Sequence, residues 1–232
     1  MENLKQIFQK KGLPEKFETL EYEKFQNGQI IHLKLNRPSK KNALSFKMFD
    51  EILEFFTKAE NEEDLRCILV TANGGMFCAG LDLKEASENI FVQDPDRDQA
   101  RKAMQIMKIV EELQKPLRAI ELCRVPVLFG IHDRCIGGGL DMCLAGDILY
   151  CTENAQFIVK EIDIGMAADI GSLQRLPYYI NNSNELFEFA YTGKAIHSEQ
   201  ALKYGIVGKV LKTKEEMISN PLFLGKKSAW NR

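Results

Sequence analysis

The first third of the chain has an apolar pattern that predicts two strands and a helix. Apolar side chains alternate with polar or mixed neighbours over 29–35, which is typical of a strand, and the turn-forming stretch 36–39 ends it. Apolar residues then recur at helical spacing over 45–60, behind a serine suited to cap the helix. A short apolar run at 67–70 predicts a buried strand, and we expect 1–20 to be a loose lead-in.

The rest of the chain continues to alternate between helix and strand. The polar stretch 84–98 predicts a surface loop, and 99–113 has the apolar spacing of a helix that Pro116 should interrupt or restart. Further patterns predict strands at 127–131, 148–151, 157–159 and 206–211, and helices at 140–145, 186–190 and 198–203. With no linker and no change of composition, this alternation predicts one α/β domain of layered sheets and helices over 1–232.

The composition is typical of a globular protein and gives no sign of a nucleic-acid-binding, membrane-spanning or metal-binding protein. Hydrophobic residues make up 45% of the 232 positions and charged residues 28%, as in an ordinary soluble globular protein. The formal net charge of -2 gives no attraction to nucleic acid or to an anionic membrane, and no apolar run approaches the roughly 20 residues that span a bilayer. The six cysteines form no CxxC pair, only three histidines are present, and no secretory signal precedes them. We therefore expect reduced thiols in an intracellular protein without a metal site.

Two glycine-containing turns are candidates for holding an oxyanion. Gly137-Gly138-Gly139 leads into a predicted helix, where glycines permit close approach of the backbone and unpaired N–H groups are available. The alternative is a tight strand-to-helix turn, and the spacing does not fit the GxGxxG of dinucleotide-binding folds. The stretch 77–82 follows a predicted strand, and an N–H beside its Gly80 could supply a second donor, although the stretch is equally typical of an ordinary loop.

Three acids lie in segments that are otherwise small and apolar. Asp141 is one turn into the helix after the glycines, so it can face whatever their N–H groups hold; Glu161 ends a strand, and Asp169 follows across a turn. A buried carboxyl group has a raised pKa and can carry a proton near neutral pH. The alternative is that Glu161 and Asp169 are solvated loop acids, with Asp169 capping a helix that starts near Ile170. The sequence contains no GxSxG, and no histidine lies beside a serine or cysteine in a recognisable nucleophile motif.

Four motifs occur together: Asn36-Arg37-Pro38, Lys41-Asn42-Ala43-Leu44, Phe77-Cys78-Ala79-Gly80-Leu81-Asp82-Leu83 and Gly137-Gly138-Gly139-Leu140-Asp141. Jointly they resemble the crotonase family of enoyl-CoA hydratases and isomerases over about Gly28 to Leu211. The segment 159–171, with 173–177 after it, is similar to one branch in particular, the Δ3,5-Δ2,4-dienoyl-CoA isomerases. The resemblance implies an α/β fold built as a crotonase-like spiral of ββα units, with a core over about 25–212 and the usual C-terminal helical region missing or shortened.

The resemblance also implies how a substrate binds. An acyl-CoA thioester is the expected substrate, its carbonyl held by the main-chain N–H groups of Leu81 and Gly138, with no cofactor and no metal. A homo-oligomer, trimer or hexamer, is expected in the mitochondrion or peroxisome, and the chain itself shows no clear targeting signal. Phe91, Met104 and Met107 are candidates to bound the acyl tail, with core packing as the alternative for the two methionines. Further contacts to the substrate or CoA are expected from Lys41, Ala43, Ala79, Gly80, Asp82, Leu83 and Gly137.

The three acids match the isomerase branch better than the hydratases. By resemblance, hydratases carry glutamates at the positions of Asp141 and Glu161 and lack an acid at that of Asp169. We therefore expect an isomerase that shifts the double bonds of 3,5-dienoyl-CoA to 2,4-dienoyl-CoA in fatty-acid β-oxidation. Asp169 would take the proton from C2, Glu161 would deliver one to C6, and Asp141 would tune or hold Glu161. Two alternatives stay open: an enoyl-CoA hydratase in which Asp141 and Glu161 activate water, and a non-catalytic crotonase-fold assembly or RNA-binding module.

Overall fold

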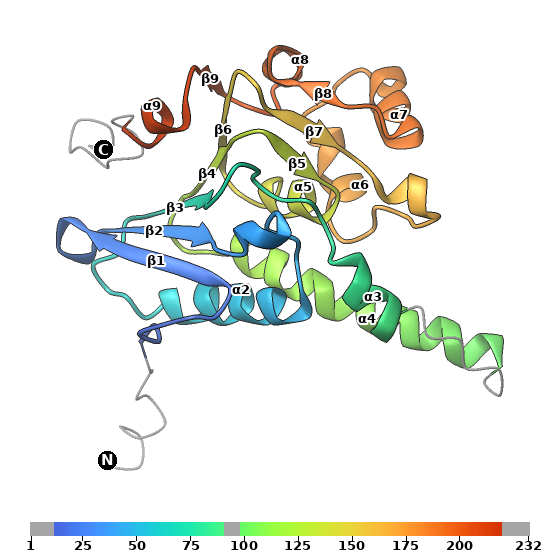
Figure 1. Cartoon of the computed structure of the whole chain (residues 1–232), viewed down its shortest axis with the longest axis horizontal. Helices are drawn as coiled ribbons and strands as arrows, with labels where there is room; N and C mark the ends of the chain where they lie inside the picture. Colours follow the sequence, from blue (N-terminus) through green and yellow to red (C-terminus); the bar gives the residue numbers. More distant parts are fainter. Residues whose placement is uncertain (1–11, 91–97, 220–232) are drawn as a thin grey trace.

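The computed structural model describes residues 12–90 and 98–219, whose helices pack against two β-sheets (Figure 1). The larger sheet has six strands in the order β1-β2-β3-β4-β6-β9, and the smaller has three in the order β5-β7-β8. Within these two ranges, no helix is long and apolar enough to cross a membrane. The strands are β1 (Leu20–Phe25), β2 (Ile30–Leu35), β3 (Cys67–Ala72), β4 (Val127–Ile131), β5 (Arg134–Ile136), β6 (Ile148–Thr152), β7 (Gln156–Ile158), β8 (Ile196–His197) and β9 (Lys209–Leu211).

Helices follow most of the strands and vary widely in length. The α-helices are α2 (Phe46–Ala59), α3 (Leu83–Asn89), α4 (Gln99–Glu121), α5 (Gly138–Cys143), α6 (Ser172–Arg175), α7 (Ser183–Thr192), α8 (Ser198–Tyr204) and α9 (Lys214–Ile218). Short 3-10 turns are η1 (Gln26–Gly28), η2 (Pro38–Lys40), η3 (Glu161–Ile164) and η4 (Leu176–Tyr178).

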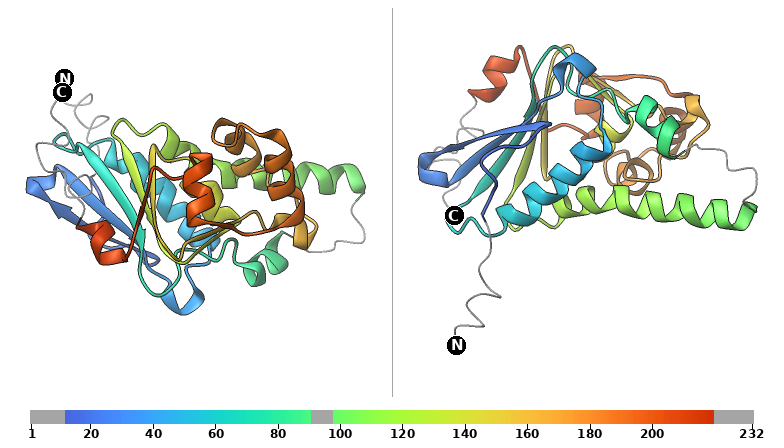
Figure 2. Two further views of the ribbon diagram at one scale, coloured as in Figure 1. Left: turned by 90° about the horizontal axis from the view of Figure 1, so that it is seen from above. Right: turned by 60° about the horizontal axis from the view of Figure 1, so that its bottom comes forward.

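The larger sheet is covered on both faces. Every residue of β3 is buried, because neighbours along a strand point to opposite faces and both faces are packed. Val70 belongs to the main core, whereas Leu69 packs with Met217 of α9 in a smaller cluster. Figures 1 and 2 show α2 and α4 along one side of the sheet and α9 on the other. The apolar side chains of α2 and α4 therefore complete the main core.

The chain builds the fold as a repeated turn. Strand β4 enters the larger sheet, β5 enters the smaller sheet and α5 follows; β6, β7 and α6 repeat this order. The two preceding turns have single bridges in place of the smaller-sheet strand, since Leu44 pairs with Leu81 and Cys78 pairs with Cys135. This is the spiral of ββα units that the sequence predicts. It places the segments around Leu44, Leu81 and Gly137 next to one another.

Most of the predicted elements are confirmed. Strands β2, β3, β4 and β6 lie where the apolar runs predict them, and helices α7 and α8 cover their predicted segments. Helix α2 matches the predicted helix over 45–60, and the Ser45 hydroxyl accepts a hydrogen bond from the Met48 N–H at 3.1 Å as its N-cap. The last strand is shorter than predicted, because β9 begins only at Lys209.

Three expectations about local structure are wrong. The first strand was expected at 29–35, but β1 already begins at residue 20 as an edge strand held by antiparallel pairing with β2; residues 1–11 of the expected lead-in lie outside the described residues. The stretch 84–98 is not wholly a loop, because α3 occupies its first part; 91–97, including Phe91, lies outside the described residues. Helix α4 is not interrupted by Pro116, because the buried Leu113 and Leu117 around it keep the helix packed on the core.

The remaining differences concern short elements. Strands β5 and β8 and helix α9 have too few residues to show a clear period in the sequence. The expected shortening of the C-terminal helical region concerns 220–232, which lies outside the described residues.

Candidate active site

The loop after β3 presents an unpaired main-chain N–H at Leu81. The Leu44 N–H donates to the Gly80 carbonyl at 2.8 Å, and the Asp82 N–H donates to the Leu44 carbonyl at 2.9 Å. This parallel bridge uses the groups on either side of the Leu81 N–H, which has no acceptor within the described part of the chain. Gly80 has a φ of +87°, and a Cβ there would lie 2.9 Å from the Ile136 carbonyl oxygen, so the loop passes directly over the end of β5.

The second unpaired N–H belongs to Gly138, at the start of α5. Gly137 turns the chain with φ +50° and ψ -122° and donates its own N–H to the Ile158 carbonyl at 2.8 Å. The Gly138 N–H has no acceptor among the residues described. A Cβ built on Gly138 would lie 3.9 Å from the Leu81 nitrogen, so the two free donors are neighbours. Two adjacent, preorganised N–H groups of this kind can stabilise negative charge on one oxygen.

Both donors and two of the three acids line the same pocket, which has a volume of about 330 Å³. Leu81, Gly138, Glu161 and Asp169 all contribute to its surface. An apolar wall of the pocket comes from one face of α4: Ile106, Ile109, Val110 and Leu113. The arrangement suits a ligand with a carbonyl group at one end and an apolar chain next to it.

Glu161 contributes a carboxyl group to the lining of this pocket. It begins η3, just beyond β7, and a Cβ on Gly137 would lie only 2.9 Å from its Oε1. Its Oε2 is buried and has no hydrogen-bond partner within the described ranges. Burial raises the pKa of the Glu161 carboxyl, and the nearby Asp169 raises it further. Glu161 is therefore suited to hold a proton and release it to a substrate.

Asp169 lies in the segment between η3 and α6, with its main chain fastened from two sides. Its carbonyl accepts hydrogen bonds from the side-chain amides of Gln114, at 2.9 Å, and Gln174. The helix that follows begins at Ser172 with Gly171 as its N-cap, so the alternative of Asp169 as a helix cap is wrong. The Asp169 side chain is free to act on a ligand in the pocket that it lines.

Asp141 is behind the pocket rather than in it. Its side chain is fully buried, it is not part of the pocket surface, and its Oδ1 accepts a hydrogen bond from the Ser172 N–H. The expectation that Asp141 faces the ligand held by the glycine N–H groups is therefore wrong, because that face of α5 packs against the start of α6. Burial, followed by repulsion from Glu161, raises the pKa of Asp141 to about 7. No hydrogen bond joins Asp141 to Glu161 within the described residues, so any influence between them is electrostatic.

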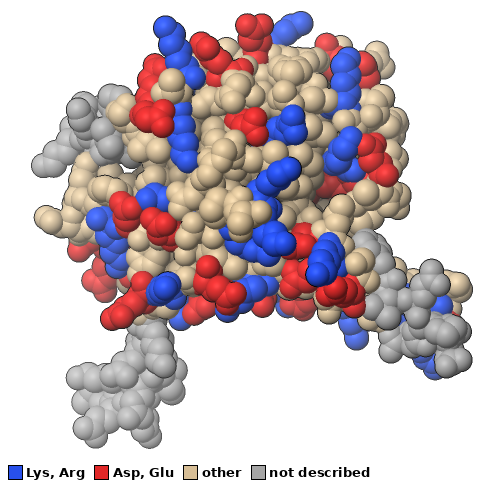
Figure 3. All heavy atoms as spheres, viewed as in Figure 1, with Lys and Arg blue, Asp and Glu red and all other residues tan. Residues whose placement is uncertain are grey.

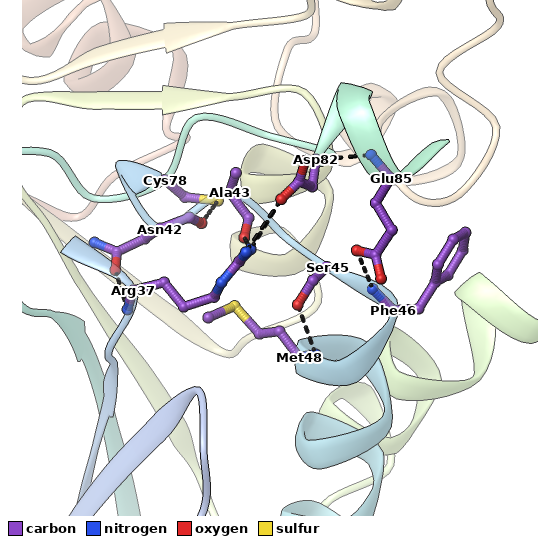
Figure 4. Close-up of polar contacts among 9 residues, drawn as sticks. All are labelled: Arg37, Asn42, Ala43, Ser45, Phe46, Met48, Cys78, Asp82 and Glu85. Atoms are coloured by element: carbon purple, nitrogen blue, oxygen red, sulfur yellow. Dashed lines mark hydrogen bonds and ion pairs between the residues drawn. The ribbon is translucent and has the colours of Figure 1, made fainter. Parts of the chain in front are cut away.

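The residues expected to contact substrate or CoA divide into two groups. Ala79, Gly80, Leu83 and Gly137 line the pocket. Three others are next to the pocket loop without lining the pocket: Lys41, Ala43 and Asp82. Figure 4 shows that Asp82 faces Arg37, with which it forms an ion pair at 3.1 Å. The Ala43 carbonyl also accepts a hydrogen bond from Arg37, and the Lys41 carbonyl accepts one from the Ala79 N–H at 3.0 Å.

The residues expected to bound the acyl tail do not form the apolar wall that the structure shows. Met104 and Met107 neither pack in the core nor line the pocket, since they are 59% and 62% exposed. The wall is formed instead by four other residues of the same helix, Ile106, Ile109, Val110 and Leu113. Their spacing of three and four along α4 is a signal that the sequence does contain.

Acidic and basic side chains are interspersed on the face shown in Figure 3, without a continuous basic surface. Within the described ranges, no group of three or more histidine, cysteine, aspartate or glutamate side chains is arranged to hold a metal ion. The polar groups that line the pocket include the two N–H donors, the Glu161 and Asp169 carboxyl groups and Lys160.

Comparison with known proteins relates the chain to one family of enzymes. The enoyl-CoA hydratase/isomerase family model matches residues 25–229. The mitochondrial Δ(3,5)-Δ(2,4)-dienoyl-CoA isomerase of Rattus norvegicus is 38% identical over 90% of this chain and 65% of its own length. The peroxisomal Δ(3,5)-Δ(2,4)-dienoyl-CoA isomerase of Arabidopsis thaliana is 37% identical over 88% of this chain and 73% of its own. The crystal structure of an enoyl-CoA hydratase from Mycobacterium smegmatis superposes with a TM-score of 0.71 at 24% identity, covering 86% of this chain and 72% of that one.

The chain spans less than two thirds of the length of the mammalian relatives that it matches. The family match nevertheless covers most of the chain, including Leu81 and Gly138 and all three acids. The chain belongs to the enoyl-CoA hydratase/isomerase, or crotonase, family.

Proposed function

We propose that the protein isomerises 3,5-dienoyl-CoA to 2,4-dienoyl-CoA, a double-bond shift in fatty-acid β-oxidation. The observation that carries the proposal is that Asp169 and Glu161 line one pocket together with the free N–H groups of Leu81 and Gly138. Relatives named Δ(3,5)-Δ(2,4)-dienoyl-CoA isomerase are 37–39% identical over most of the chain, which supports the same reaction here.

The reaction moves one proton and two double bonds. With the thioester carbonyl at the Leu81 and Gly138 N–H groups, removal of a proton from C2 places negative charge on the carbonyl oxygen, where the two donors stabilise it. The charge of this dienolate extends through the conjugated chain to C6. A proton added at C6 converts the double bonds at C3–C4 and C5–C6 into double bonds at C2–C3 and C4–C5. No atom is gained or lost, and the two carboxyl groups and two N–H donors account for each proton transfer and for the charge that develops, so the scheme uses no cofactor and no metal.

Each pocket acid has one part in this scheme. Asp169, ionised, takes the proton from C2. Glu161 starts protonated, which its raised pKa favours, and delivers its proton to C6. Asp141 has the role of tuning Glu161 electrostatically from behind the pocket, since the two carboxyl groups repel each other. After turnover Asp169 carries a proton and Glu161 a charge, and exchange with solvent restores both.

The same proposal includes an acyl-CoA thioester as ligand and a homo-oligomer, a trimer or hexamer, in the mitochondrion or peroxisome. Large apolar side chains exposed beyond the pocket support an assembly, since such side chains are often covered by another chain. Phe187 and Tyr191 of α7 are 50% and 69% exposed and stack with their ring centroids 5.6 Å apart. Relatives named mitochondrial and peroxisomal support the two compartments.

Neither the hydratase nor the non-catalytic module explains the site as well as the isomerase does. An enoyl-CoA hydratase would use Asp141 and Glu161 to activate a water molecule, yet Asp141 is fully buried and outside the pocket surface. A non-catalytic RNA-binding module would need a basic surface, whereas the formal net charge is -2 and the charges in Figure 3 are mixed.

Ultraviolet absorbance distinguishes these functions directly. The purified chain is incubated with a 3,5-dienoyl-CoA and, separately, with a 2-enoyl-CoA. We expect conversion of the first to the 2,4-diene, which absorbs at longer wavelength, and little hydration of the second. Hydration of the enoyl-CoA without isomerisation would favour the hydratase, and no reaction with either would contradict an enzymatic role for the chain.

A further inference from the structure

Arg37 joins the two segments whose bridge leaves the Leu81 N–H free. Its Nη1 donates to the Ala43 carbonyl at 2.6 Å, and Nη1 and Nη2 both contact Asp82 Oδ2, at 3.2 Å and 3.1 Å. Ala43 and Asp82 are the neighbours of the bridged pair, Leu44 and Leu81. Figure 4 shows the guanidinium between the two segments. The Arg37 side chain thus bonds to both bridged segments, in addition to the main-chain hydrogen bonds that join them.

A second set of contacts fixes the same loop to the helices. The Asp82 Oδ1 accepts a hydrogen bond from the Glu85 N–H at 3.4 Å and caps α3. The Glu85 carboxylate accepts one from the Phe46 N–H, at the first residue of α2, at 3.1 Å. Asp82 therefore serves two partners with its two oxygens, and loss of Arg37 would leave the helix cap in place while releasing the link to Ala43.

The Arg37 guanidinium faces protein groups and not the pocket. It is absent from the pocket surface, and its side chain is only 22% exposed. A guanidinium presents its donors in a fixed planar fork, so it can hold a carbonyl and a carboxylate at a set separation, which a lysine cannot do. Arg37 therefore acts on a ligand only through the segments that it holds.

We propose that Arg37 is a positioning residue for the oxyanion hole: by holding the Asp82 carboxylate to the Ala43 carbonyl, it sets the direction of the Leu81 N–H. The inference rests on the proposed function only for its kinetic consequence, because the position of the N–H can be measured without turnover. It also reassigns Asp82 from a substrate contact to a partner of Arg37.

The test uses Arg37→Met, Arg37→Lys and Asp82→Asn in the full chain. Asn remains a good helix cap, so Asp82→Asn removes the ion pair while keeping the start of α3, and it serves if Arg37→Met does not fold. The first readout is the infrared stretch of octanoyl-CoA labelled with ¹³C at the thioester carbonyl. Hydrogen-bond donors that polarise a carbonyl lower its stretching frequency. We therefore expect the carbonyl of octanoyl-CoA bound to the wild type to absorb at a lower frequency than in solution. In all three variants the frequency should move back toward the solution value. Hydrogen exchange of the 79–83 amides should become faster in parallel.

The kinetic readout is the isomerisation of 3,5-dienoyl-CoA. Loss of a whole oxyanion donor costs on the order of 10²–10³ in kcat, so a misdirected donor should lower kcat roughly tenfold to a hundredfold with a smaller change in KM. The double variant Arg37→Met with Asp82→Asn should be no worse than the poorer single variant, since both remove one contact. Arg124→Met is the matched control, because Arg124 also donates to main-chain carbonyls, at Glu60 and Leu65, away from the pocket.

The outcomes separate the two proposals. If the wild type lowers the carbonyl frequency but does not isomerise the diene, the proposed function fails, and the frequency and exchange data still decide the role of Arg37. A wild-type frequency and unchanged exchange in Arg37→Met and Asp82→Asn would overturn that role, as would equal effects of Arg124→Met. A wild type that leaves the frequency of the bound thioester at its solution value would overturn both proposals.

Discussion

The side-chain amide of Gln114, on α4, donates a hydrogen bond to the main-chain carbonyl of Asp169 at 2.9 Å. The long helix that forms the apolar wall of the pocket therefore also holds the segment that carries the proposed base. One hydrogen bond between residues far apart in sequence therefore connects the segment that contains Asp169 to the helix that forms the apolar wall.

Gln114→Leu should consequently lower kcat for isomerisation more than it changes KM. A neutral hydrogen bond contributes roughly 0.5–1.5 kcal/mol, so we expect a fall of up to about tenfold in kcat; Gln174 still donates to the same carbonyl. Gln200→Leu is the control, since Gln200 donates instead to Tyr204 on α8. Equal kinetic effects of the two substitutions would contradict a specific role for Gln114.

The buried Asp141 predicts a pH-dependent stability. Its pKa in the folded protein is raised to about 7, above the value of about 4 expected in the unfolded chain. The folded state therefore binds the proton more tightly, and the stability that this provides is complete below about pH 4 and is lost as the pH rises to about 7.

Asp141→Asn should remove that dependence. Urea unfolding at pH 5 and pH 8 should show the wild type losing about 2.5 kcal/mol more than the variant between the two values, because each pKa unit corresponds to about 1.4 kcal/mol. Comparing the two proteins cancels the titration of the other groups. If both lose the same stability, Asp141 does not titrate in this range.

The apolar wall on α4 predicts a limit on acyl length. Ile109→Phe adds volume at the pocket surface, so kcat/KM for a long 3,5-dienoyl-CoA should fall about tenfold or more relative to a short one, since one methylene in an apolar pocket is worth about 1–3 kcal/mol. Met107→Phe lies on the same helix but away from the pocket, and it should leave the ratio unchanged. A series of acyl-CoA lengths measures both, and a uniform effect on all lengths would contradict the assignment.

The sequence patterns singled out two glycine-containing turns as candidates for holding an oxyanion, and the family resemblance named Leu81 and Gly138 within them. In the structure both N–H groups lack an acceptor among the described residues, but the geometry of the acids did not follow from the sequence. Asp141 was misplaced because its direction depends on which face of α5 packs against Ser172, a contact with a residue in a later turn of the spiral. Patterns within one segment do not specify such long-range packing.

Local propensity was overridden in the same way elsewhere. Only the first residue of β1 is buried, so its apolar pattern is weak, and pairing with β2 defines it. Pro116 costs α4 a main-chain hydrogen bond, but burial of Leu113 and Leu117 keeps the helix continuous. In both cases tertiary contacts, which the sequence does not display, determine the element.

The central claim is that Asp169 takes the proton from C2 and Glu161 gives one to C6. The most direct test follows 3,5-dienoyl-CoA in deuterium oxide by mass spectrometry and proton NMR. The wild type should form the 2,4-diene with deuterium at C6. Glu161→Gln should lose at least roughly 100-fold in isomerisation, the usual contribution of a general acid, while still exchanging hydrogen at C2. Asp169→Asn should neither exchange nor isomerise. Isomerisation at the wild-type rate by Asp169→Asn, or C2 exchange that depends on Glu161 and not on Asp169, would contradict the account.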